Sequence, residues 1–187
     1  MKFKNKLNLL ISLLLITALV LACNSYETEK ANKLVDEANK SITEGNDAFK
    51  DANEKSDKMI DAEASITSES QVEGVKGQAK DVVAAYEKAS KGYSTASSKF
   101  DEASKLNVQE KFKEYLQTKS QAMKKLSEMC DAAKGIGQAM IDSKKREEFR
   151  EKVKSANEKV DQINKEAKDL ESKANKIMEE NKDMFKK

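Results

Sequence analysis

The side chains most able to do chemistry in this sequence are two thiols, Cys23 and Cys130, and a large number of carboxylates. The chain has no histidine, so it lacks the commonest general base and the commonest metal ligand. Glu110 and Glu114 could in principle bind a metal ion, but the carboxylates alternate with lysines at helical spacing, as on solvent-exposed helix faces. We find no nucleophile–base pair, phosphate-binding loop or cysteine cluster. We therefore expect no enzyme activity, no cofactor and no metal site.

Cys23 follows an apolar segment at the start of the chain. Residues 7–21 are almost all apolar, and three lysines precede them: Lys2, Lys4 and Lys6. A basic start, an apolar middle and a small residue before the cut are typical of a secretory signal peptide, and about 15 residues are too few to span a membrane. Val20-Leu21-Ala22-Cys23 is similar to a bacterial lipobox, in which cleavage after Ala22 leaves an acylated Cys23. We interpret residues 1–22 as a lipoprotein signal peptide and Cys23 as a membrane-anchoring lipidation site. An ordinary signal peptide with a chance cysteine is the alternative.

The charge balance argues against nucleic acid as a partner. The chain has 35 basic and 33 acidic residues, and three of the basic residues lie in the signal peptide, so the exported part has one acidic residue in excess. A nucleic-acid-binding surface is strongly basic. Nothing in the composition indicates whether the exported protein is a monomer or an oligomer.

A seven-residue hydrophobic repeat runs through nearly all of the chain after residue 30. Apolar residues recur in alternate steps of three and four along four segments, which are separated by short polar breaks at 67–71, 105–107 and 142–146. Such a repeat predicts long amphipathic helices, and short breaks force antiparallel neighbours. We therefore expect an all-α fold, an elongated antiparallel up-down-up-down four-helix bundle of heptad-patterned long helices, in residues 31–187. Residues 23–30 would be a lipidated tether. A single long coiled coil that assembles with other chains is the alternative.

Several residues have predicted places in this bundle. Asn107, followed by Glu110, is typical of a helix N-cap with its capping-box partner, and Ser143 is a candidate N-cap for the last helix. Cys130 lies on the third apolar stripe, where we expect a small buried side chain; a reactive or dimer-forming thiol is the alternative. Lys119 interrupts the same stripe, and we expect its ammonium to extend past the core to water.

The predicted bundle gathers a group of basic residues at one end. If the first helix leads away from the membrane, the breaks at 67–71 and 142–146 lie far from the anchor, and the only two arginines of the chain are there. A guanidinium binds carboxylate or sulfate with two parallel hydrogen bonds. Four glycines near this end, which lower helix propensity, predict a looser structure: Gly74, Gly77, Gly135 and Gly137. The candidate partner contacts are Lys144, Lys145, Arg146 and Arg150. The alternative is that these are ordinary loop charges.

The lysine-rich signal peptide, the Val20–Cys23 motif and the Lys-, Glu-, Asn- and Ala-rich body without proline resemble outer-surface helical lipoproteins of Borrelia-type spirochaetes. Among these, the size and helical patterning are most similar to the factor-H-binding surface lipoproteins of the relapsing-fever group. The resemblance implies a lipid-anchored, surface-exposed outer-membrane protein that binds a host serum or matrix protein for immune evasion or adhesion. The host proteins implied are a complement regulator such as factor H, plasminogen, or a matrix component such as decorin or fibronectin. The resemblance carries over no binding residues.

The sequence is also compatible with two other functions. The first is a structural or envelope lipoprotein that acts by self-association or by periplasmic contacts. The second is a carrier whose alanine-rich core opens around a lipid or another apolar ligand.

Overall fold

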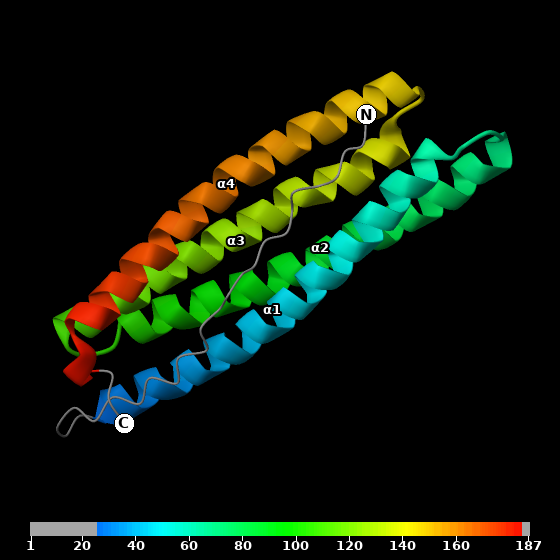
Figure 1. The fold of residues 1–187 in the computed structure, drawn as a ribbon. Helices are drawn as coiled ribbons and strands as arrows, with labels where there is room; N and C mark the ends of the chain where they lie inside the picture. The colour runs from blue at the N-terminus through cyan, green and yellow to red at the C-terminus, as the bar shows by residue number, and fades with distance from the viewer. Residues whose placement is uncertain (1–25, 185–187) are drawn as a thin grey trace.

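The computed structural model describes residues 26–184, and they form four long antiparallel helices (Figure 1). The helices are α1 (Tyr26–Ala64), α2 (Glu69–Ser104), α3 (Glu110–Asp142) and α4 (Arg146–Glu180), followed by the short 3₁₀ helix η1 (Lys182–Met184). The predicted all-α, up-down-up-down four-helix bundle is confirmed. The signal peptide and Cys23 lie outside the described residues, so their assignment stays a prediction. None of the helices in residues 26–184 is both long and apolar enough to cross a membrane.

The helix ends differ from the predicted ones at several points. Helix α1 begins at Tyr26, so residues 26–30 of the expected tether are helical. Acidic Glu27 and Glu29 lie in its first turn, where the helix dipole favours negative charge. The predicted cap at Asn107 is wrong, because α3 begins two residues after Val108, with Gln109 as its N-cap. The backbone N–H of Asn107 instead donates a hydrogen bond to the Glu27 carboxylate.

The α3–α4 connection also differs from the prediction. Ser143 is the C-cap of α3 rather than the N-cap of α4, and its backbone N–H donates to the Ala139 carbonyl at 3.0 Å. The N-cap of α4 is Lys145. A short link of three residues, 143–145, therefore joins the two helices. Because the link is so short, the helices must lie antiparallel.

Each helix packs along the helix before it and the helix after it. Figure 1 shows α2 and α3 in the middle, with α1 beside α2 and α4 beside α3. Helices α1 and α4 make no extensive contact with each other. The links 65–68 and 143–145 lie at the same end of the bundle, opposite the start of α1 (Figure 1). We call this the distal end.

The α1–α2 contact is close and is fixed by polar groups within an apolar interface. The buried hydroxyls of Tyr93 and Tyr86 donate hydrogen bonds to the side-chain oxygens of Asn46 (2.7 Å) and Asn53 (2.8 Å). Burial raises the pKa of both tyrosines, so both keep the proton that makes the bond. A Cβ at Gly92 would lie 2.7 Å from the Gly45 Cα, so the glycine allows the two backbones to approach.

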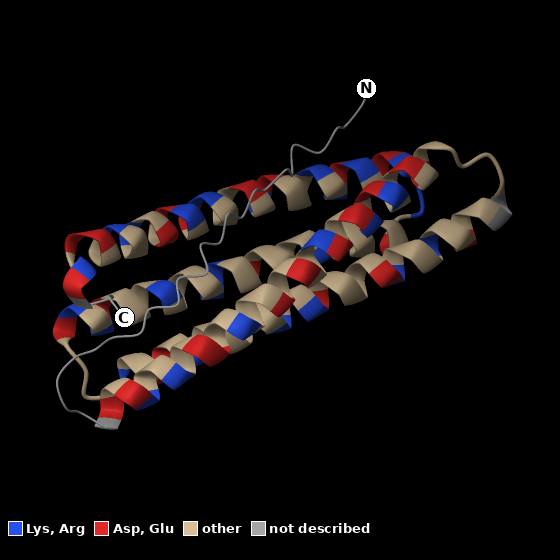
Figure 2. Ribbon diagram, turned by 60° about the horizontal axis from the view of Figure 1, so that its bottom comes forward, with Lys and Arg blue, Asp and Glu red and all other residues tan. Residues whose placement is uncertain are grey.

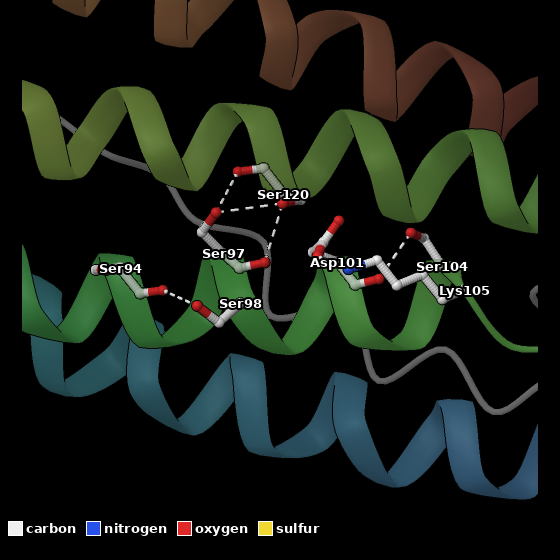
Figure 3. Close-up of polar contacts among 7 residues, drawn as sticks. All are labelled: Ser94, Ser97, Ser98, Asp101, Ser104, Lys105 and Ser120. Atoms are coloured by element: carbon white, nitrogen blue, oxygen red, sulfur yellow. Dashed lines mark hydrogen bonds and ion pairs between the residues drawn. The ribbon is translucent and has the colours of Figure 1, made fainter.

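Helices α2 and α3 are joined by a pair of serines (Figure 3). The Ser97 hydroxyl donates to the Ser120 carbonyl and the Ser120 hydroxyl donates to the Ser97 carbonyl, both at 2.9 Å. Gly137 makes a second close approach, because a Cβ there would lie 2.7 Å from the Ala79 carbonyl oxygen. Gly137 therefore has a packing role, in addition to any effect on helix propensity.

Helix α4 is attached to α3 by charge as well as by apolar contact. The Lys119 ammonium lies 2.9 and 2.8 Å from the two carboxylate oxygens of Glu171, and 5.9 Å from the centre of the Phe100 ring. The Lys119 side chain is only 9% exposed. The expectation that Lys119 reaches water is therefore wrong: the ammonium is satisfied inside the protein by an acidic residue of the neighbouring helix.

Candidate partner-binding surface

The distal tip, defined as residues 63–68 and 143–150, holds all four predicted contact residues. It is built from the end of α1, the two distal links and the first turn of α4. In Figure 2 the link between α3 and α4 is blue, whereas the link between α1 and α2 is tan. Elsewhere blue and red alternate along the helices (Figure 2). The tip is therefore a place where two connections that are distant in sequence lie at one end of the molecule.

Arg146 joins the two halves of the distal tip. Its Nε lies 2.8 Å from Oε1 of Glu63, and its Nη2 donates to the Glu63 backbone carbonyl at 2.9 Å. The Glu63 side chain is 7% exposed and that of Arg146 is 40% exposed. The same Glu63 carbonyl accepts the backbone N–H of Ile66 at 3.2 Å. Arg146 thus fastens the start of α4 both to the end of α1 and to the link that follows it.

The 65–68 link is held by the first turn of α2. The Gln71 side-chain oxygen accepts the backbone N–H groups of Thr67 (2.7 Å) and Ser68 (3.0 Å), and the Gln71 N–H donates to the Ser68 carbonyl at 3.2 Å. Ser68 is the N-cap of α2, and Gln71 at the third helical position is its capping-box partner. Gln71, predicted to lie in the break, is in fact helical and fixes the loop before it.

The 143–145 link is held by Glu148. Its carboxylate accepts a hydrogen bond from the Lys152 ammonium and one from the backbone N–H of Lys144. These two bonds, in that order, lower the pKa of Glu148 below its usual value. Both distal links are therefore held by side chains of the helix that follows them.

The remaining predicted contact residues project their charge into solvent. Lys144, Lys145 and Arg150 are all exposed, and none of the three side chains forms an ion pair with a described residue. Two half-buried isoleucines lie at the same end of the bundle and pack against its core: Ile66 on the α1–α2 link and Ile141 near the end of α3. The structure therefore separates the four basic residues into Arg146, which organises the tip, and three exposed residues without an ion pair to a described residue, of which Lys144 is near enough to Glu148 to help lower the pKa of its carboxyl.

Each of the other candidate residues either has a structural role or lacks the neighbours that a metal site would need. Cys130 is a free thiol with no exposed area, as the sequence predicts, and burial raises its pKa. Glu114 pairs with Lys111 at 2.8 Å on the surface of α3. Within residues 26–184, no three His, Cys, Asp or Glu side chains are close enough together to hold a metal ion.

Comparison with known proteins gives no relative. No protein-family model matches the chain, and neither a curated protein sequence nor a solved structure resembles it significantly. The protein is an all-α four-helix bundle, and its function has to be argued from the residues of this chain.

Two residues of the distal tip, Glu63 and Ile66, were not identified from the sequence. Glu63 falls on the apolar stripe of α1, which marks it only as an interruption of the repeat. An acidic residue at a buried position needs a cation or several hydrogen-bond donors, so the stripe did contain a signal that a basic partner exists. Which residue supplies that charge depends on how α1 and α4 converge.

Proposed function

We propose that this protein is a lipoprotein, anchored in the outer membrane through Cys23 and exposed at the cell surface, that binds a host protein. Candidates are a complement regulator such as factor H, plasminogen, or a matrix component, bound for immune evasion or adhesion. The observation that carries the proposal is the distal tip. Three exposed cations that form no ion pair with a described residue, Lys144, Lys145 and Arg150, lie at the end of the bundle opposite the start of α1.

The dimensions of the bundle support this proposal. Helix α1 has 39 residues and is therefore about 58 Å long. It begins three residues after Cys23, so an acyl anchor on that cysteine would be close to the near end of the bundle. A stiff rod of this length would hold its tip well away from the headgroups of the bilayer. Binding a partner at the tip needs no catalytic group.

A panel of purified host proteins tests the proposed function. The full chain in detergent micelles is passed over immobilised factor H, plasminogen, fibronectin and decorin, with serum albumin as the control surface. We expect saturable binding to at least one of the four and none to albumin. Absence of binding to all four would contradict the proposal.

Two experiments test where the protein is located. We expect protease treatment of intact cells to digest it, whereas a periplasmic envelope lipoprotein would be spared. We also expect Cys23→Ser to move the protein from the detergent phase to the aqueous phase on phase separation, because the acyl chains would be absent. Unchanged partitioning would contradict the lipid anchor.

A further inference from the structure

Two connections that are more than 70 residues apart in sequence lie at the distal tip and are joined there through Arg146 and Glu63. The Glu63 carbonyl accepts hydrogen bonds from Ile66 of one link and from Arg146 at the end of the other. Since both donors meet at one oxygen, the Arg146 guanidinium lies beside the uncharged link 65–68. Arg146 therefore connects the start of α4, next to the basic link, to the uncharged link.

From this geometry we infer that the distal tip docks an acidic polypeptide segment, with Lys144, Lys145 and Arg150 as contacts and Arg146 as the residue that positions them. This inference rests on the proposed function and specifies its binding site and the chemistry of its partner. Arg146 acts through the ion pair with Glu63, whereas the other three cations would meet the partner's carboxylates.

The surroundings of the three cations favour a protein over a sulfated polysaccharide. Half-buried Ile66 and Ile141 lie at the same end of the bundle as the basic link, and a protein interface combines apolar contacts with charged ones at its rim. Glu147 and Glu148 lie in the same first turn of α4, and α1 carries more acidic than basic residues. A polysaccharide with charge along its whole length would meet this negative charge, whereas a short acidic segment would not.

Two triple variants test the contact residues. The first, K144Q/K145Q/R150Q, removes three positive charges from the tip. The matched control, K159Q/K165Q/K168Q, removes three from exposed positions on the shaft of α4. An exposed ion pair accounts for roughly twofold in affinity, so we expect the tip variant to bind about tenfold more weakly. We expect the shaft variant to bind within about twofold of the wild type, since its charges lie outside the tip.

The probes are the panel protein that the wild type retains and a short oligoglutamate peptide, both as an immobilised ligand and as a competitor. We expect the oligoglutamate peptide to bind the full chain, to lose that binding in the tip variant, and to compete with the panel protein. Equal binding by the tip and shaft variants would overturn the inference while leaving the proposed function intact. Competition by heparin but not by the oligoglutamate peptide at equal charge would overturn it in favour of a sulfated polysaccharide.

The role of Arg146 is tested by changing both members of its ion pair. R146Q removes a positive charge and E63Q removes a negative one, so simple attraction of an acidic partner predicts weaker binding for the first and tighter binding for the second. If Arg146 positions the surface, both variants bind more weakly, by about threefold or more for a lost charge-assisted contact. Tighter binding by E63Q would overturn the positioning role. Circular dichroism of each variant verifies that the helices are intact.

Discussion

The ion pair between Lys119 and Glu171 provides the sharpest test of how α4 is attached to the bundle. The Lys119 side chain is 9% exposed and that of Glu171 is 24% exposed. Breaking a buried ion pair by removing one partner costs about 3–5 kcal/mol, because a charge stays buried and uncompensated. We expect Glu171→Gln to cost about 2–3 kcal/mol, below that range because Glu171 is near the surface and water can reach the ammonium once the carboxylate is gone.

The reverse change should cost far less. Lys119→Met keeps the aliphatic stem in the core beside Phe100 and leaves Glu171, which can turn its partly exposed carboxylate toward water. Replacing a buried ion pair by apolar side chains of similar volume is often neutral or stabilising, and after Lys119→Met the remaining carboxylate is not left buried. We therefore expect Lys119→Met to change the free energy of unfolding by less than about 1 kcal/mol, and the double variant to resemble it.

Urea and thermal unfolding, followed by circular dichroism at 222 nm, measure this asymmetry. For a chain of this size, about 2–3 kcal/mol corresponds to a decrease in Tm of about 5–10 °C for Glu171→Gln. A surface pair elsewhere, Lys33 with Glu29, gives the control, and replacement of Glu29 by Gln should change stability by less than about 0.5 kcal/mol. Equal losses for Lys119→Met and Glu171→Gln would refute the argument that an uncompensated buried ammonium sets the cost.

Three further predictions concern packing, acid stability and thiol reactivity. Gly92→Ala should destabilise the protein by about 1–2 kcal/mol in urea unfolding, because its Cβ would meet the backbone of Gly45. Gly77→Ala, where nothing lies within 4 Å, should stabilise it by up to about 1 kcal/mol, so losses of equal size would contradict the packing argument. The pKa of Glu148 is lower in the folded state than in the unfolded state. The stabilisation that Glu148 contributes is therefore fully present above the ordinary glutamate pKa of 4.5, and it is lost as the pH falls below that value through the folded pKa. The protection of amides at the start of α4 against hydrogen exchange, corrected for the intrinsic exchange rate at each pH, should accordingly fall on acidification, and Glu148→Gln should remove that dependence. Alkylation of Cys130 by iodoacetamide, followed by mass spectrometry, should be undetectable in native buffer and rapid in urea, because burial raises the pKa of the thiol; rapid native alkylation would show that the thiol is accessible.

The heptad repeat was sufficient to predict the helices, whereas their ends were predicted less well. The apolar stripe fixes which face of each helix is buried, and stripe residues such as Ile42, Leu116 and Met123 are fully buried. Helix ends depend on a few hydrogen bonds that can come from other segments. Asn107 was predicted to cap α3, but Glu27 from α1 binds its backbone N–H. A capping pattern in sequence cannot reveal a competitor that lies 80 residues away.

For the candidate binding surface, the residues could be predicted from the sequence, but their roles could not. It placed the four basic residues at one end, and the helix order of the structure agrees. Arg146 and Arg150 are one helical turn apart and look equivalent in sequence. In the structure one is paired with a buried carboxylate and the other has no ion pair with a described residue. This difference arises because α1 and α4 approach each other at the distal end.

The amino-acid sequence alone determined that this chain forms four long helices, because the period of its apolar residues matches the turn of an α-helix and short polar breaks allow only antiparallel neighbours. Only the tertiary structure decided which charges are paired. Lys119 with Glu171 and Arg146 with Glu63 join residues that are 52 and 83 positions apart. Such pairs depend on the relative rotation and axial position of two helices, which are set by packing across the entire bundle.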